Sequence, residues 1–141
     1  MKNKLFIVVV LAALLLLSSL SVSMAGYWEP FTAYTNAWNG YVELKEGKRM
    51  DCPSSRAAIG VSADSITFFC KIEAKVNNRW VNVTRDGDVT CFSADPGSFE
   101  RVTLIHYRNP QTIFNNIPLR ACGRSGQYLH QELMKGSINF N

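Results

Sequence analysis

The stretch from Ser65 to Ala74 alternates apolar and polar side chains with a period of two residues. The apolar side chains of Ile66, Phe68, Cys70, Ile72 and Ala74 fall on one face, whereas Lys71 and Glu73 fall on the other. Successive side chains of a β-strand point to opposite faces, so this pattern predicts a strand with one buried face. A buried sheet face needs a second layer, which favours an antiparallel β sandwich or a barrel-like fold.

Similar β signals recur along the chain, separated by turn-forming pairs. The expected strands are Tyr41–Leu44, Ala57–Ala63, Trp80–Thr84, Val89–Ser93 and Ser98–Arg108. The expected turns are Glu46-Gly47, Asn77-Asn78, Asp86-Gly87 and Asp95-Pro96-Gly97. Asp86-Gly87 predicts a hairpin between the two segments that flank it. Such closely spaced turns are typical of a mostly β domain.

Two kinds of structure are expected near the C-terminus. Gln127–Lys135 fits a short helix that buries Leu129 and Leu133 and ends at Gly136. Beyond it, the alternation of Ile138 and Phe140 predicts a final edge strand. No linker or low-complexity segment interrupts the chain, so we expect one domain.

The first 25 residues have the pattern of a secretory signal peptide. Lys2 and Lys4 precede an apolar run from Leu5 to Leu17, and Ser23-Met24-Ala25 resembles a cleavage site. The alternative is an uncleaved anchor, since spanning a membrane takes about 20 apolar residues. Cleavage would leave 116 residues (141 − 25), enough for one domain at 26–141 without a further membrane span. We expect a secreted protein, extracellular or, in a bacterium, periplasmic.

The charge of this exported part is close to balanced. The chain has 15 basic and 11 acidic residues, and the signal peptide removes Lys2 and Lys4, which leaves 13 against 11 and a net charge of +2. A nucleic-acid partner is therefore not expected.

Four cysteines, Cys52, Cys70, Cys91 and Cys122, lie in the exported part. An even number of cysteines in an exported chain predicts two disulfides, with three pairings open. The spacing of cysteine and histidine does not fit a metal site, and no cofactor is expected. The sequence thus predicts a small domain stapled by disulfides.

Two stretches of the chain resemble each other and suggest a degenerate duplication. Trp38, Gly47 and Cys52 in "AWNGYVELKEGKRMDC" correspond to Trp80, Gly87 and Cys91 in "RWVNVTRDGDVTC". A duplication would pair Cys52 with Cys70 and Cys91 with Cys122. The rival pairing is Cys70 with Cys91 and Cys52 with Cys122, but if their strands flank Trp80–Thr84 in one sheet, Cys70 and Cys91 lie about 10 Å apart. The alternative is two ordinary hairpins, because the spacing between the halves is not constant. In either case Trp80 is expected to be buried.

Residues 38–72 resemble one repeat of the dermatopontin-type secreted matrix proteins. The resemblance lies in "WNGYVELKEGKRMDCP", the apolar "AAIGVSA" and "FFCKI", which ends the repeat with an aromatic residue and a cysteine. The second half departs from the pattern, because Cys91 lacks a following proline and "NIPLRAC" replaces the usual ending. The resemblance implies a non-catalytic extracellular protein that contacts matrix, glycans or cell surfaces.

Aromatic and basic residues near the start of the exported part are the candidate binding site. They are Tyr27, Trp28, Tyr34, Trp38, Lys45, Lys48 and Arg49. Exposed rings stack on sugars, and basic residues attract anionic glycans. The alternatives are that the rings, with Phe31, cover one end of the core and that the basic residues form a solvated hairpin tip.

An enzyme is the second hypothesis. Glu100, His106 and Arg108 would project from one face of a strand and could serve a metal-free ribonuclease as base, acid and anion clamp. However, six residues of strand place Glu100 and His106 about 20 Å apart. Val102 and Leu104 between them predict that this face belongs to the core.

Two further features remain open. The loop Asp95–Phe99 suggests a third class, an inhibitor or structural protein. Asn82-Val83-Thr84 is a glycosylation sequon, with Asn82 the acceptor if the source is eukaryotic. We expect a secreted binding module for glycan, matrix or a cell-surface protein, and the oligomeric state stays open.

Overall fold

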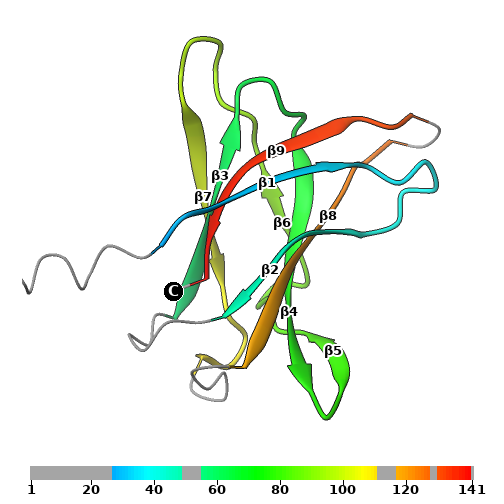
Figure 1. Ribbon diagram of the computed structural model, residues 1–141, viewed down its shortest axis with the longest axis vertical. Helices are drawn as coiled ribbons and strands as arrows, with labels where there is room; N and C mark the ends of the chain where they lie inside the picture. The colour runs from blue at the N-terminus through cyan, green and yellow to red at the C-terminus, as the bar shows by residue number, and fades with distance from the viewer. Residues whose placement is uncertain (1–26, 49–54, 111–116, 128–129, 141) are drawn as a thin grey trace, which may run out of the picture.

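The computed structural model describes residues 27–48, 55–110, 117–127 and 130–140, and these form nine strands and no helix (Figure 1). The strands are β1 (Glu29–Tyr34), β2 (Val42–Lys48), β3 (Arg56–Ser62), β4 (Phe68–Val76), β5 (Arg79–Asn82), β6 (Val89–Cys91), β7 (Glu100–His106), β8 (Pro118–Arg124) and β9 (Leu133–Asn139). The expected signal peptide lies outside the described residues. Within these ranges, no helix has the length and hydropathy needed to cross a membrane.

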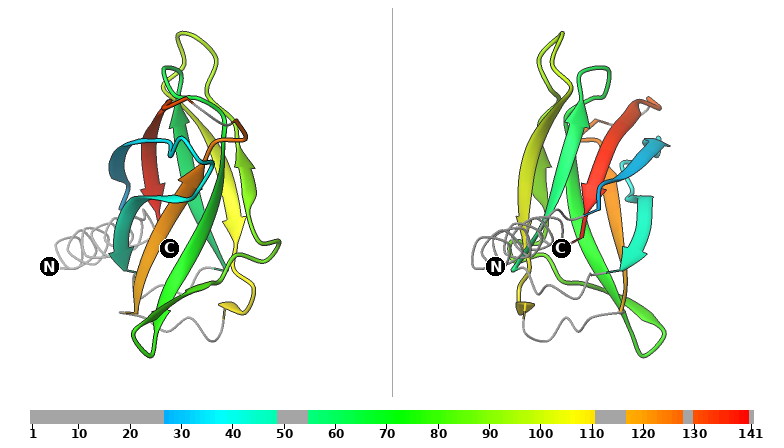
Figure 2. Two further views of the ribbon diagram at one scale, coloured as in Figure 1. Left: turned by 90° about the vertical axis from the view of Figure 1, so that its right-hand side faces the viewer. Right: turned by 60° about the vertical axis from the view of Figure 1, so that its left-hand side comes forward.

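The strands form two antiparallel sheets that face each other (Figure 2). One sheet has the order β1-β9-β3-β7 and is called sheet A. The other, sheet B, has the order β2-β8-β4-β5, and β6 also pairs with β4. Neither sheet closes into a barrel, so the predicted mostly β fold is confirmed as two layers.

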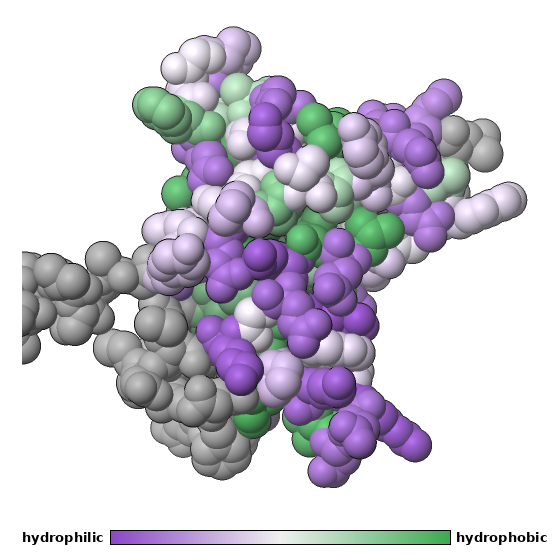
Figure 3. Space-filling model, in the orientation of Figure 1, coloured by the Kyte–Doolittle hydropathy of each residue, from purple (hydrophilic) through white to green (hydrophobic). Residues whose placement is uncertain are grey.

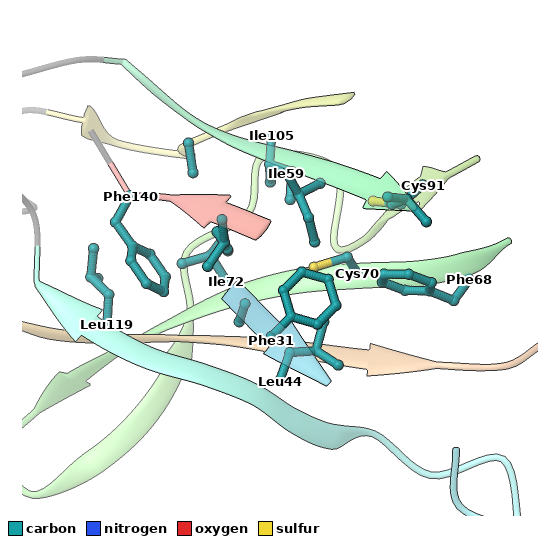
Figure 4. Packing of buried hydrophobic residues seen from close by; sticks show 14 of the residues in the cluster. Phe31, Leu44, Ile59, Phe68, Cys70, Ile72, Cys91, Ile105, Leu119 and Phe140 are labelled. Atoms are coloured by element: carbon teal, nitrogen blue, oxygen red, sulfur yellow. The ribbon is translucent and has the colours of Figure 1, made fainter. Parts of the chain in front are cut away.

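The hydrophobic core lies between the sheets (Figure 4). On β4, the predicted inner face is confirmed, because Phe68, Cys70, Ile72 and Ala74 are all buried. Sheet A covers them with the buried side chains of Ile59, Val61, Ile105, Met134 and Ile138. These are mainly branched apolar residues, which suit a pleated, half-buried surface.

Both corners of the two-layer structure are tied together. At one corner β1 lies against β2, and Lys45 Nζ lies 3.3 Å from Glu29 Oε2. At the other, the chain after β5 pairs with the end of β7: Thr84 lies opposite Tyr107. The Arg85 amide donates to the His106 carbonyl at 2.9 Å.

The predicted hairpin around Asp86-Gly87 is wrong. β5 and β6 do not pair with each other; each pairs with a different part of β4. The actual hairpin joins β4 to β5 through Asn77 and Asn78, whose φ angles of 49° and 61° confirm that predicted turn. Gly87, with φ of 88°, turns the chain between Thr84, which lies opposite Tyr107, and strand β6.

Three other expectations are corrected. Glu46-Gly47 is not a turn but part of β2, where a side chain at Gly47 would come within 2.6 Å of the Phe140 ring. The C-terminal helix is absent from the described residues, and Leu133 begins strand β9 instead. β9 is not an edge strand, because it lies between β1 and β3. Its buried residues, Met134, Gly136 and Ile138, repeat every second position and therefore suit a strand.

The two similar stretches do not occupy equivalent positions. Trp38 lies in the loop after β1 and is 79% exposed, whereas Trp80 lies on β5 and is partly buried. Trp80 is therefore largely covered, as expected, although it lies outside the core between the sheets. Its ring lies on the outer face of sheet B, with the Arg120 guanidinium 4.4 Å above it.

The predicted pairing of Cys91 with Cys122 does not fit this fold. β6 and β8 lie on opposite sides of β4, about 10 Å apart, and Cys91 faces the core while Cys122 faces outward. Cys70, Cys91 and Cys122 are buried free thiols in this structure, and Cys52 lies outside the described residues. The structure thus contains no disulfide among the described cysteines.

Candidate functional site

An open groove of about 510 Å³ lies at one end of the sandwich. It is lined by Ile66, Thr67, Phe69, Ser125, Gly126, Gln127 and Glu132. These residues come from three segments: the start of β4, the end of β8 and the residues just before β9. We call it the end groove.

Hydrogen bonds hold the polar wall of the end groove in place. The Ser125 hydroxyl donates to Glu132 Oε2 at 3.2 Å and accepts from the Gln127 amide at 2.9 Å. Thr35 holds the backbone at Glu132 in place, because the Thr35 hydroxyl accepts a hydrogen bond from the Glu132 amide at 2.9 Å. The wall therefore has a fixed hydroxyl and a fixed carboxylate, with the exposed side chain of Gln127 beside them.

Phe69 forms the apolar part of the end groove. The Arg124 guanidinium lies 4.7 Å from its ring centroid. Gly126 approaches the ring so closely that a β-carbon there would lie 3.3 Å from Phe69 Cε2. An aromatic ring beside directional polar groups is the usual composition of a small-ligand site.

The outer face of sheet B, next to the end groove, carries a dense set of charges. We call it the charged face, and it comprises Tyr41, Lys71, Glu73, Trp80, Asp88, Arg120, Cys122 and Arg124. The side of the molecule seen in Figure 3 is mainly polar, and hydrophobic residues form only small separate areas on it.

The charges of this face are paired with one another. Glu73 lies 2.6 Å from Lys71 Nζ and 2.6 Å from Arg120 Nη2. Asp88 Oδ2 accepts from the Tyr41 hydroxyl at 2.5 Å and from Arg124 Nη2 at 3.1 Å. Burial and the bond to Asp88 raise the pKa of Tyr41 to about 12, so its proton stays in place at neutral pH.

The cations also stack on rings. Lys71 Nζ lies 4.3 Å from the Tyr41 centroid, and Arg124 lies over Tyr41 and Phe69. Cations over ring faces are attracted to the ring quadrupole. With partners on both sides, these cations stabilise sheet B rather than offer a site to an external anion.

Cys122 is a protonated thiol within this network. It is 3% exposed, and its Sγ lies 3.7 Å from Glu73 Oε2. Burial, with the negative charge of Glu73, raises the pKa of Cys122 to about 12. A nucleophilic cysteine needs a lowered pKa, so this thiol does not fit a catalytic role.

Glu73→Gln should make the protein less stable at neutral pH but not in acid. Burial acts to raise the pKa of Glu73, but the bonds from Lys71 and Arg120 outweigh it, and the pKa lies below the ordinary value. A lowered carboxyl pKa stabilises the fold above the unfolded-state pKa, and this stabilisation is lost as the pH falls through the folded-state pKa. We expect a loss of about 2 kcal/mol at pH 7, which shrinks below pH 4.

The measurement is urea unfolding of both proteins between about pH 3 and pH 8. Glu46→Gln, on an exposed part of β2, is the control and should change stability by under about 0.5 kcal/mol. A loss for Glu73→Gln that is equal at both ends of this pH range would contradict the assignment.

The predicted aromatic site is divided in space. Trp28 precedes β1 and Tyr34 ends it, so about 20 Å of strand separates them. Tyr27 lies beside Trp28, and both are exposed. Phe31, between the two ends, is buried in the core.

Tyr34 and Trp38 belong to the same end of the molecule as the end groove. The loop after β1 runs from Tyr34, opposite Leu133, to Val42, opposite Gly123. It therefore lies beside the connection between β8 and β9, as Figure 1 shows on the right. Tyr34 is 62% exposed and Trp38 is 79% exposed.

The predicted basic turn is not a turn. Lys45 and Lys48 lie on β2, and Lys45 is paired with Glu29. Arg49 lies outside the described residues. The basic residues are thus not gathered near the end groove.

The ribonuclease hypothesis is not supported by the geometry of β7. The strand pairs with β3 over seven successive residues without a bulge, which keeps Glu100 and His106 about 20 Å apart. The Glu100 carboxylate accepts from Ser137 Oγ at 2.6 Å. The expectation of a core face here is wrong, because Val102 and Leu104 are 55% and 42% exposed.

The structure also describes the predicted glycosylation sequon at Asn82 and the loop Asp95–Phe99. Asn82 Nδ2 donates to the Gly87 carbonyl at 2.6 Å, and Thr84 of the same sequon is fully buried. The loop Asp95–Phe99 contains a turn at Gly97, with φ of 87°, and ends at Phe99, which is 97% exposed. In the described ranges, no three metal-binding side chains gather at one point.

Sequence reasoning missed the end groove. Its polar wall, Ser125 to Gln127 and Glu132, carries no motif and lies about 60 residues from Thr67 and Phe69 in the chain. The pairing of β4 with β8 brings Ser125 to Gln127 beside Phe69, and the Ile66 amide, which donates to the Leu133 carbonyl at 3.0 Å, holds the segment with Glu132 nearby.

A scan of protein-family models, a search of curated proteins and a search of solved structures returned no match to this chain. The resemblance to dermatopontin-type repeats therefore stays a prediction.

Proposed function

We propose that this protein is an exported, non-catalytic binding module whose end groove receives a short glycan. The observation that carries the proposal is the open groove of about 510 Å³, in which Phe69 lies beside Ser125, Gln127 and Glu132. Sugar rings present apolar C–H faces and a ring of hydroxyl groups. An aromatic side chain suits the first, and amide and carboxylate groups suit the second.

The charges next to the end groove favour a neutral glycan over a sulfated one. Arg124 is held by Asp88 and lies over the Phe69 ring, and Glu132 contributes negative charge to the groove. Tyr34 and Trp38, exposed at the same end, would extend the contact along a longer chain. A matrix or cell-surface protein would be recognised through such a glycan.

Gln127→Ala should weaken glycan binding by about fivefold, because one hydrogen bond contributes about 1 kcal/mol and tenfold corresponds to 1.4 kcal/mol. A glycan array of the exported protein would identify the ligand, and calorimetry would give the affinities. Gln131→Ala removes an exposed amide that does not line the groove and should bind normally. Equal affinities for the two variants, or an array without any binder, would contradict the proposal.

We also propose export with removal of residues 1–25 and one disulfide between Cys70 and Cys91. These cysteines lie on paired strands and both face the core. The Cys91 side chain lies within hydrogen-bonding reach of Cys70, and this contact, with burial, raises the pKa of Cys70 well above its ordinary value. In an oxidising compartment, two thiols give two electrons and two protons to a disulfide oxidant and form one bridge.

Peptide mapping of the unreduced exported protein should therefore link Cys70 to Cys91 and show a chain that begins at Gly26. The bridge would enclose 20 residues (91 − 70 − 1) and stabilise the fold by roughly 3 kcal/mol. Cys122, on the other face of sheet B, should be absent from that linked peptide. A link between Cys91 and Cys122 would contradict the strand order.

A further inference from the structure

The edges of the two sheets differ in how well they are protected against pairing with another chain. Unpaired edge strands attract other strands, and proteins shield them with proline, bulges, charge or short length. β1 has Pro30 on its edge, and β2 has a bulge between Glu43 and Lys45. β5 and β6 have only four and three residues.

β7 is the exception among these edges. It is seven residues long, contains neither proline nor glycine, and pairs with β3 without a shift in register. It forms the margin of sheet A, at the left in Figure 1. Val102 and Leu104 on its outer face are 55% and 42% exposed, and Phe99 just before it is 97% exposed.

The hydrogen bonds at the end of β7 show which backbone groups point to the free edge. The His106 carbonyl and the Arg108 amide bond to Arg85 and Val83 on that side, while the Tyr107 amide bonds to Ser55 on the β3 side. Backbone groups alternate between the two sides of a strand. The amide and carbonyl groups of Glu100, Val102 and Leu104 therefore face the free edge.

We propose that two copies of this chain form a two-fold dimer in which β7 pairs antiparallel with β7 of the partner subunit, centred on Val102. This register places Val102 opposite itself and Glu100 opposite Leu104. Each backbone amide and carbonyl of these three residues at the free edge then pairs with a carbonyl or amide of the partner subunit. Six hydrogen bonds would form. The pairing ends before His106, where Arg85 already occupies the edge.

Charge and apolar surface both suit this register. No like charges lie opposite each other in this register, because Glu100 faces Leu104 and Arg101 faces Thr103, and the Glu100 carboxylate stays bonded to its own Ser137. The exposed side chain of Val102 packs against its own copy across the axis. A two-fold interface of this kind is self-complementary and closed, so it stops at a dimer.

Val102→Pro tests the pairing without disturbing sheet A. The amide of Val102 faces the free edge and makes no bond to β3, so proline removes only a donor to the partner subunit. Sedimentation of the exported protein from about 1 to about 500 µM should show a dimer for the natural sequence and half that mass for the variant. Circular dichroism should show the same β content for both.

Cysteine cross-linking tests the register. In a directly opposed, hydrogen-bonded pair the Cα atoms lie about 5.5 Å apart, which a disulfide can span. With oxidised glutathione as the acceptor of two electrons and two protons, Val102→Cys should yield a covalent dimer. Leu104→Cys should not, because the two Leu104 positions lie about 13 Å apart along the strands.

A monomeric natural protein over the whole concentration range would overturn the proposal, as would open aggregates or a cross-link at Leu104→Cys alone. A Val102→Pro protein that remains a dimer would also overturn it. If Val102→Pro does not fold, Val102→Lys replaces it. Two lysines would then face each other at the two-fold axis, so this variant should be monomeric. A Val102→Lys dimer would overturn the proposal. The glycan proposal does not depend on these outcomes.

Discussion

Gly136→Ala should destabilise the protein by about 3 kcal/mol or more, enough to unfold a large share of a marginal domain. Gly136 lies in the middle of β9, and a β-carbon there would overlap the Gly60 carbonyl oxygen. That oxygen is part of the β3 backbone and is held by the ladder with β9, so it cannot rotate away. The two central strands of sheet A would have to separate.

Urea unfolding measures the effect, and Gly123→Ala is a matched control. A β-carbon at Gly123 would lie 2.8 Å from Met134 Sδ and 3.2 Å from the Leu44 methyl groups. These are the ends of flexible side chains, which can move, so the loss should be nearer to 1 kcal/mol. Equal losses at the two positions would contradict the close approach of β3 and β9.

Phe68→Ala should cost about 3–5 kcal/mol of unfolding free energy. Phe68 is 1% exposed at the start of β4, and its ring meets the Phe31 ring edge to face, with centroids 6.3 Å apart (Figure 4). Alanine would leave a cavity between the two sheets that neighbouring strands cannot close. Thermal and urea unfolding would both report the loss.

Phe99→Ala is the control, since it removes the same ring from a position that is 97% exposed. Its free energy of unfolding should change by no more than about 0.5 kcal/mol. A comparable loss for the two phenylalanines would contradict the assignment of Phe68 to the core and of Phe99 to the surface.

Local patterns predicted the parts of this fold that depend on local chemistry. The alternation on β4 gave its buried face, and Asn77-Asn78 gave the turn after it, because asparagine tolerates positive φ. The partner of each strand depends on distant residues instead. Asp86-Gly87 forms a turn, but the strands on either side of it, β5 and β6, each pair with a different part of β4. No local sequence signal indicates that these two strands pair with β4 rather than with each other.

The errors on β7 and β9 have a common cause. Val102 and Leu104 alternate as core residues do, yet the pairing of β7 with β3 turns them to the outer face of sheet A and turns Ile105 to the core. β9 has small residues, Gly136 and Ser137, which weaken any strand signal, but β1 and β3 on either side hold it as a strand. The exposure of Val102 and Leu104 and the strand structure of β9 both depend on which strands lie alongside, and long-range pairing sets those neighbours.

The candidate site was only partly predictable. Exposed aromatic residues at Tyr34 and Trp38 were expected and lie at the end where the groove opens. The groove itself joins Phe69 to Ser125 through the pairing of β4 with β8, and to Glu132 through the bond between Ile66 and Leu133. Because these residues form no motif in the chain, the sequence alone does not predict that they line one groove.

The most direct test of the proposed function is a backbone NMR titration of the exported protein with the best glycan from the array. Shifts should concentrate at Thr67, Phe69 and Ser125 to Gln127 and extend to Trp38. The charged face around Glu73 and the free edge of β7 should show little change. Shifts centred on Trp28 or on β7, with the groove unaffected, would contradict the assignment of the end groove as the binding site.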